Sequence, residues 1–337
     1  MARLWAVLVA VWKAAQRDRK SLASFSGNNI FHLGFALLFL QDPGAFVFSA
    51  VLIAIVLFLP LSGDPLRKVP PERLALWPLE AGERRLLRMT PWLNPLLPLI
   101  LAMLLWRKVT TGLALLLGGT FAVGFLAPRA GRGGGRRLFG RLPPFPGPLN
   151  QLIRKNLREL FSTLDFYCAL LLAAPALFFQ AGGRLPEEAV GPVTLVILLA
   201  LSTCAQTLFG LDGEGGLTRY RLLPLRGWQV LLAKDAAFLM TAVAMTAALE
   251  PLGGLAGALM ALAGGRRAAV QVDRRQARWR FQMGASFGAS LFQMTLLVVA
   301  GAGTMFWTPL LIVPCVAVYA ATTYWFGRMI DRQACAE

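Results

Sequence analysis

The sequence is poor in charged residues and contains a single histidine, His32. Charged residues make up 15% of the 337 residues, whereas hydrophobic residues make up 56% and the mean hydropathy is +0.59. Because soluble globular domains carry about 25% charged residues, this composition excludes an ordinary soluble domain and predicts a polytopic membrane protein. A single histidine also excludes the H-E-x-x-H zinc motif and a histidine-rich metal site.

Motifs of nucleotide binding and hydrolysis are missing as well. No G-x-x-x-x-G-K-[ST] sequence occurs, so the chain has no phosphate-binding loop of that class. The residues from Gly284 to Gly288 match the G-x-S-x-G motif of serine hydrolases, but the only histidine lies upstream, whereas that motif requires one downstream. The four cysteines show no C-x-x-C spacing and are interpreted as small apolar side chains. We therefore expect no catalytic residue, no metal site and no bound cofactor in this chain, which is not expected to be an enzyme.

Ten apolar blocks are predicted to be transmembrane helices, because a spanning helix needs about 20 apolar residues, or fewer when flanking polar residues reach the interface. The predicted fold is an all-α polytopic membrane protein with four spans followed by six. The blocks are Ile30–Leu40, Ala45–Leu61, Trp92–Trp106, Gly112–Ala127, Phe166–Phe179, Val190–Phe209, Ala236–Leu249, Leu252–Ala263, Ser286–Ala302 and Trp307–Phe326. Several blocks are short, which leaves open that 30–61 and 92–127 are re-entrant hairpins.

Three regions are predicted along the chain. Residues 1–127 form an N-terminal transmembrane half, residues 128–150 a cytoplasmic linker rich in glycine, proline and arginine, and residues 151–337 a C-terminal transmembrane half. The segment Gln151–Ser162 has apolar residues at helical spacing on one face and Arg154, Lys155 and Arg158 on the other, which predicts an amphipathic helix in the membrane interface. The segment Arg3–Arg19 is a candidate for a second interfacial helix, although its apolar residues are less regularly spaced.

The basic residues indicate how the chain is oriented. All but Arg107, Lys108 and Arg184 of the 34 lysines and arginines fall in segments on one side of the predicted spans, including the loop with Arg266 and Arg267. The positive-inside rule then places this side, with both termini, in the cytoplasm. The same rule accounts for the net charge of +17, so we expect no nucleic-acid partner.

A polar island, Gly210–Asp235, separates two apolar blocks in the C-terminal half. It contains ions that cannot lie in hydrocarbon, where each would cost several kcal/mol, so it is expected at the cytoplasmic face. The sequence Arg73–Arg88 looks like a degenerate copy of Arg219–Lys234. In this repeat the aligned pairs are Arg73 with Arg219, Pro78 with Pro224, and Arg88 with Lys234.

Two pairs of glycines are predicted to let membrane helices approach closely. Gly253 and Gly257 in the eighth block, and Gly284 and Gly288 near the ninth, are each four residues apart. Small residues at this spacing line one face of a helix and are typical of helix contacts in membranes.

The order of parts in the C-terminal half resembles the permease subunit of a bacterial type-two ABC exporter. An amphipathic helix and two spans precede a cytoplasmic segment with Phe209-Gly210-Leu211-Asp212, Gly216-Leu217, Leu222-Leu223-Pro224-Leu225 and Lys234, and four spans follow. Ala233 stands where the family often has glycine, and the N-terminal half departs from the common six-span plan.

The resemblance implies a multi-pass protein of the bacterial cytoplasmic (inner) membrane that works with two copies of a separate ATP-binding cassette subunit. That partner would bind ATP and Mg²⁺, while the permease forms a homodimer or pairs with a second permease subunit in the lipid bilayer. The expected coupling residues are Asp212, Arg219, Arg221, Pro224, Arg226 and Lys234 of the island and Arg154, Lys155 and Arg158 of the amphipathic helix. A weaker second coupling segment would contain Arg73, Pro78 and Arg88.

Two alternatives to a transporter subunit remain open at this point. The predicted spans show no clear row of polar residues, which favours a non-transporting scaffold or regulatory subunit. A membrane-embedded enzyme acting on lipid-linked substrates is less favoured, because no paired carboxylates or histidines share a membrane depth.

Overall fold

The computed structural model describes residues 29–38, 149–212, 220, 224–271 and 282–335, together with positions 9, 46, 80 and 102. Within these residues the regular secondary structure consists of eight α-helices and two 3-10 helices, which confirms the all-α class for this part of the chain. The chain divides into two compact units. One comprises Met1–Phe25 with Ile30–Leu138, and the other comprises Ser26–Asn29 with Phe139–Glu337.

The first unit contains most of helix α3 (Asn29–Leu38), which covers the described part of the first apolar block. The second, third and fourth blocks and the linker lie outside the described residues, apart from single positions and the linker's last two residues. Arg73, Pro78 and Arg88 of the second coupling segment also lie outside them.

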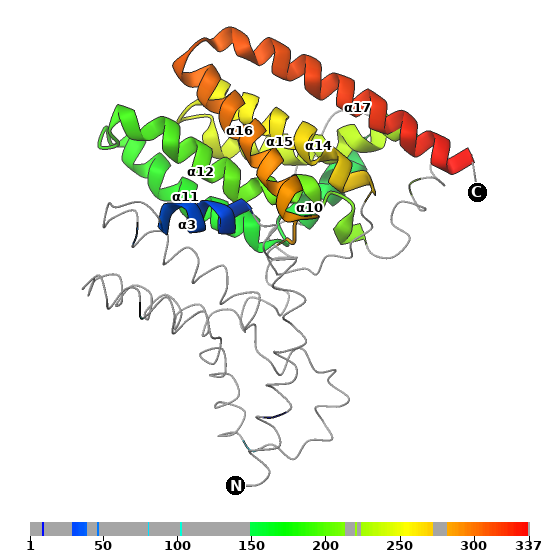
Figure 1. Cartoon of the computed structure of the whole chain (residues 1–337), viewed down its shortest axis with the longest axis horizontal. Helices are drawn as coiled ribbons and strands as arrows, with labels where there is room; N and C mark the ends of the chain where they lie inside the picture. Colours follow the sequence, from blue (N-terminus) through cyan, green and yellow to red (C-terminus); the bar gives the residue numbers. More distant parts are fainter. Residues whose placement is uncertain are drawn as a thin grey trace. The chain divides into compact units, whose positions relative to one another are not determined.

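The second unit is a helical bundle (Figure 1). Each of the last six apolar blocks overlaps one long helix. In chain order the helices are α10 (Asn150–Leu160), α11 (Leu164–Ala181), α12 (Glu187–Gln206), η4 (Gly210–Asp212), α14 (Gly227–Thr246), α15 (Pro251–Gln271), α16 (Phe287–Phe306), η5 (Pro309–Leu311) and α17 (Ile312–Cys335). Among the described residues, five segments are long and apolar enough to cross a membrane, namely α11, α12, α14, α16 and Pro309–Arg332.

Helix α15 is the centre of the bundle and contacts α12, α14, α16 and α17. Several of its alanines, such as Ala258 and Ala261, are completely buried. Gly253 and Gly257 lie where α15 meets α16, and a Cβ placed on Gly301 of α16 would be 3.4 Å from the Gly253 carbonyl oxygen. Glycine and alanine therefore let the two backbones come close.

The other predicted glycine pair behaves differently. Gly284 precedes α16, which begins at Phe287, so it does not lie on that helix. Gly288 is exposed, and a Cβ added there would meet no heavy atom within 4 Å. Gly284 and Gly288 therefore do not form a close helix contact in the described part of the chain.

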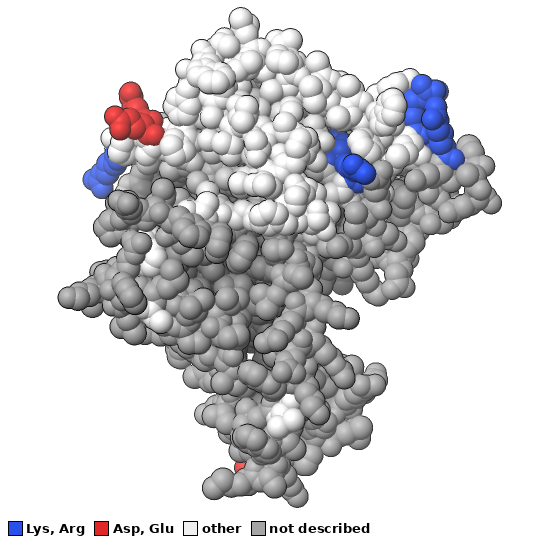
Figure 2. Space-filling view, in the orientation of Figure 1, with Lys and Arg blue, Asp and Glu red and all other residues white. Residues whose placement is uncertain are grey.

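The face of the second unit drawn in Figure 2 carries few charged side chains. An acidic patch with a basic one beside it lies at one end, other basic side chains lie toward the opposite end, one of them set well in from it, and a wide uncharged area lies between. Large aromatic side chains are exposed near both ends of the last span, with Trp307 82% and Trp325 73% accessible. Trp307 follows the end of α16 and Trp325 lies in α17, and exposed tryptophans are typical of the interfaces of a bilayer.

Candidate functional site

Helix α10 is an amphipathic helix that packs against α14. Leu157 and Leu160 are buried on its inner face, whereas Arg158 is exposed on its outer face. The buried face also includes polar side chains, because Asn156 is 6% exposed and Glu159 is 7% exposed. Burying a polar side chain is unfavourable unless it finds hydrogen-bonding or ionic partners. The contact between α10 and α14 therefore includes polar groups as well as apolar ones.

Asp212, at the end of η4, is the centre of a charged cluster between α10 and α14. Its Oδ2 lies 2.8 Å from the Lys234 ammonium, and its Oδ1 contacts the Lys155 ammonium. The Tyr220 hydroxyl donates to Oδ1 over 3.0 Å, and Lys155 donates to the Tyr220 oxygen over 2.8 Å. Three of the predicted coupling residues, from three segments of the chain, therefore meet in one network, which we call the Asp212 cluster (Lys155, Asp212, Tyr220 and Lys234).

Lys234 lies in the interior and not on a surface that a partner can touch. Its side chain is 2% exposed, and its ammonium donates to the Leu208 carbonyl oxygen over 2.6 Å and faces the Phe209 ring at 4.8 Å. The reason is that α14 begins at Gly227 and runs without a break to Thr246, so Lys234 lies in its second or third turn. The sequence analysis placed Lys234 in the polar island, whereas in the structure Lys234 belongs to the first half of a long helix.

The ionisation of the cluster follows from burial and from its neighbours. Burial alone would raise the pKa of Asp212, but the attraction of Lys234 and the hydrogen bonds from Lys155 and Lys234 outweigh it, so this pKa lies below the usual value. Burial likewise opposes the charge of Lys155, yet the bonds to Asp212 and Tyr220 raise its pKa. For Glu159 burial is the larger effect, and its pKa is raised despite the nearby lysines. The Asp212 cluster thus contains an aspartate whose ionised form is favoured, and the neighbouring Glu159, outside the cluster, is a glutamate whose ionised form is disfavoured.

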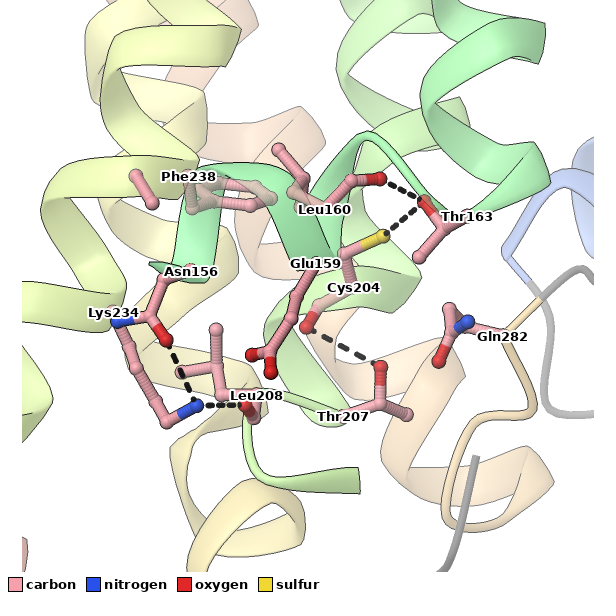
Figure 3. A pocket seen from close by; sticks show the side chains of 11 residues that line it. Asn156, Glu159, Leu160, Thr163, Cys204, Thr207, Leu208, Lys234, Phe238 and Gln282 are labelled. Atoms are coloured by element: carbon pink, nitrogen blue, oxygen red, sulfur yellow. Dashed lines mark hydrogen bonds between the residues drawn. The ribbon is translucent and has the colours of Figure 1, made fainter. Parts of the chain in front are cut away.

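A cavity of about 30 Å³ adjoins the cluster and is lined by residues that include Asn156, Glu159, Thr207 and Lys234. Figure 3 shows the Lys234 ammonium between the Asn156 side chain and the Leu208 carbonyl, with the Glu159 carboxylate on the same cavity. The Asn156 Nδ2 atom is buried without a hydrogen-bond partner among the described residues. This volume suits one or two water molecules rather than a larger ligand.

The other predicted coupling residues lie near this end of the bundle or outside the described residues. Pro224, Arg226 and Arg158 are exposed, and Arg154 is half-buried. Arg219 and Arg221 lie outside the described residues.

The structure reveals a second charged network that the sequence did not predict, which we call the Asp235 network (Asp235, Arg266, Tyr319 and Thr323). Arg266 donates to both carboxylate oxygens of Asp235 over 2.7 Å, and the Tyr319 hydroxyl donates to Asp235 over 2.9 Å. Arg266 also donates to the Thr323 hydroxyl over 2.9 Å. The prediction that Arg266 lies in a cytoplasmic loop is therefore wrong, because α15 continues to Gln271 and buries this side chain completely.

A row of polar side chains also crosses the interior, contrary to the expectation that the spans lack one. The side-chain amide of Gln206 in α12 donates to the side-chain oxygen Oε1 of Gln293 in α16 over 2.7 Å, and the Gln293 Nε2 donates to the backbone carbonyl of Ala261 in α15 over 2.7 Å. Asn29 donates to the Ser202 hydroxyl over 2.6 Å. The expectation was wrong because these residues are isolated in the sequence and meet only when the helices pack.

The described residues contain no group of three or more histidine, cysteine, aspartate or glutamate side chains placed to hold a metal ion. No family model matches the chain, and comparison with curated proteins and with solved structures gave no match either. The two charged networks and their place in the bundle are therefore the observations that bear on function.

Proposed function

We propose that the protein is the membrane-spanning permease subunit of an ATP-driven exporter, coupled to a separate ATP-binding cassette subunit. The observation that carries the proposal is the Asp212 cluster, which ties the amphipathic helix α10 and the segment before α14 to one of the spans. A partner that pushes on α10 would therefore move α14 with it. Rigid displacement of packed helices is a common way to switch a membrane site between two sides.

The distribution of charge supports an orientation for this proposal. One end of the bundle carries Arg184, Glu187 and Glu188 in the connection between α11 and α12 and at the start of α12. The opposite end, where α10, the start of α14 and the end of α17 lie, is rich in arginine and lysine. Following the positive-inside rule, we propose that the basic end faces the bacterial cytoplasm. In this arrangement the chain crosses the membrane ten times, and both termini lie in the cytoplasm.

Two exposed arginines are the proposed contacts with the partner. Arg158 lies on the outer face of α10, and Arg226 immediately precedes α14. Exposed guanidinium groups are suited to bidentate pairing with carboxylates, so the partner surface would be acidic. Lys234 is not included, because it is buried.

The test is co-purification with a soluble ATPase that contains a Walker A motif and is encoded beside this protein. We expect the wild-type chain to retain this ATPase, and the double variant Arg158→Glu with Arg226→Glu to retain about tenfold less, a loss of about 1.4 kcal/mol. Arg184→Glu, an exposed arginine at the opposite end, is the matched control and should change nothing. Failure of the wild-type chain to bind such an ATPase would contradict the proposal and favour the scaffold alternative.

A further inference from the structure

Two consecutive residues of α14 bind opposite sets of neighbours. Lys234 holds Asp212 at 2.8 Å and the Leu208 carbonyl at 2.6 Å, on the side of α10. Asp235 holds Arg266 of α15 and Tyr319 of α17, through the bonds of 2.7 and 2.9 Å described above. The pair Lys234–Asp235 is thus a connection point between the cytoplasmic elements and two helices of the bundle.

We propose that Asp235 and Arg266 are positioning residues that carry movement of α14 to α15 and α17. This inference rests on the proposed function, because it names the residues through which a displacement at α10 would reach the rest of the bundle. It assigns no contact with the ATP-binding partner to either residue.

The geometry of the Asp235 network suits a rigid connection. Both members of the ion pair are 0% exposed, and two parallel bonds fix the plane of the guanidinium relative to the carboxylate. The α14–α17 contact has a second fixed point, because the Gly227 amide donates to the Asp331 carboxylate over 2.6 Å. A helix pinned at two heights cannot slide along its neighbour without breaking one of the two contacts.

Stability alone gives little reason for such a pair. Removing two charges from water costs several kcal/mol each, and replacing a buried ion pair with well-packed apolar side chains is often neutral or stabilising. A pair kept in this setting is better explained by the directional link that it makes between helices.

The experiment uses the full-length chain in lipid nanodiscs with its ATP-binding partner. The native cysteines are changed to alanine, and spin labels are placed at Arg184→Cys and Leu310→Cys, two exposed positions at the end opposite to α10. The label distance is compared without nucleotide and with ATP and vanadate. The test variant is Asp235→Asn with Arg266→Met, which removes both charges while keeping similar volumes, and the exposed neighbour Arg267→Met is the control.

We expect ATP and vanadate to change the label distance in the wild-type and Arg267→Met chains. In the double variant the partner should still bind and hydrolyse ATP, and the melting temperature should be unchanged or higher, but the distance change should be lost. Arg266→Lys with Asp235 intact should restore part of the change, because the charge pair returns without the second parallel bond. A double variant that shows the full change, or a wild-type complex that binds ATP without any change, would overturn the inference. A wild-type chain that fails to bind the partner would instead refute the proposed function.

Discussion

The two charged networks of the bundle are built from similar ions but differ in exposure and geometry. In the Asp212 cluster two lysines, one of them with a 44% exposed side chain, converge on one carboxylate. In the Asp235 network one arginine binds one carboxylate through two bonds, and both side chains are 0% exposed. Lysine is a flexible point charge, whereas the guanidinium is a planar fork.

This difference suggests different parts in the same movement. A cluster at the edge of the bundle can exchange one lysine contact for water and rearrange at little cost. A fully buried pair that separates leaves charges without partners, at a cost of several kcal/mol. We therefore regard the Asp212 cluster as the adjustable attachment of α10 and the Asp235 network as the fixed junction of α14 with α15 and α17.

The largest effect is expected when one member of the Asp235 network is removed alone. Arg266→Met leaves the Asp235 carboxylate buried with the Tyr319 hydroxyl as its remaining described partner, which should lower the free energy of unfolding by about 3–5 kcal/mol. Thermal unfolding in detergent measures this loss. Arg267→Met, at the exposed next position, should change it by no more than about 1 kcal/mol. Equal losses in both variants would show that burial of the pair does not determine its importance.

A smaller loss is expected when the centre of the Asp212 cluster is neutralised. Asp212→Asn keeps the shape of the side chain but weakens its bonds to Lys155, Tyr220 and Lys234, so about 1.5–3 kcal/mol of stability should be lost. Thermal unfolding again gives the size of the effect, with the exposed Glu187→Gln as the control. A loss larger than that of Arg266→Met would reverse the ranking of the two networks.

The sequence predicted the helices of the second unit, but neither the contacts of Asp212 with Lys155 and Lys234 nor the Asp235 network. Long apolar blocks bounded by glycine, proline and charge are sufficient to predict helices. Asp212 stood out because ions must lie outside hydrocarbon, and Lys155 because it lies on the polar face of an amphipathic helix, and neither argument needs tertiary packing. The expected coupling role of both residues came from the resemblance to a permease subunit.

Asp235 and Arg266 were missed because each stands at the edge of an apolar block, where counting charges assigns a residue to a loop. Asp235 and Arg266 are more than 30 positions apart in the sequence. Only the packing of α14 on α15 shows that the two ions neutralise each other. A usable signal was present in Gly264-Gly265-Arg266, since paired glycines permit close helix approach. A Cβ at Gly265 would lie 2.7 Å from the Gln293 Nε2 atom and 3.1 Å from the Ala205 carbonyl oxygen.

The dependence of stability on pH should separate Glu159 from Asp212. The pKa of Glu159 is raised in the folded state, so the folded protein binds more protons than the unfolded chain between the ordinary and the raised pKa, and stability falls as pH increases through that window. The pKa of Asp212 is lowered, so its contribution is present above the ordinary value near 4 and is lost as pH falls through the lowered one.

Glu159→Gln removes the unfavourable ionisation and should therefore be stabilised relative to wild type at pH 7 and not at pH 4. Asp212→Asn should be destabilised at pH 7, with a difference from wild type that shrinks in acid. Unfolding curves of the three proteins from about pH 2 to 8 test both signs together, because the Asp212 contribution is lost only below its ordinary pKa of about 4. Parallel curves for wild type and Glu159→Gln would contradict the assignment of a raised pKa to this carboxyl group.

The smallest effect is expected at the exposed edge of the Asp212 cluster. Lys155→Met keeps the apolar stem of the side chain on α10 but removes the bonds to Asp212 and Tyr220, and Lys234 remains to neutralise the carboxylate. Because the Lys155 side chain is 44% exposed and water can replace its contacts, the loss should be about 0–1 kcal/mol. High salt should reduce the difference further, since exposed ion pairs are screened while buried ones are not. Thermal unfolding at low and high salt, about 0.05 and 0.5 M, measures the difference in stability between wild type and Lys155→Met. A salt-independent loss as large as that of Asp212→Asn would show that α10 is held as rigidly as the Asp235 junction.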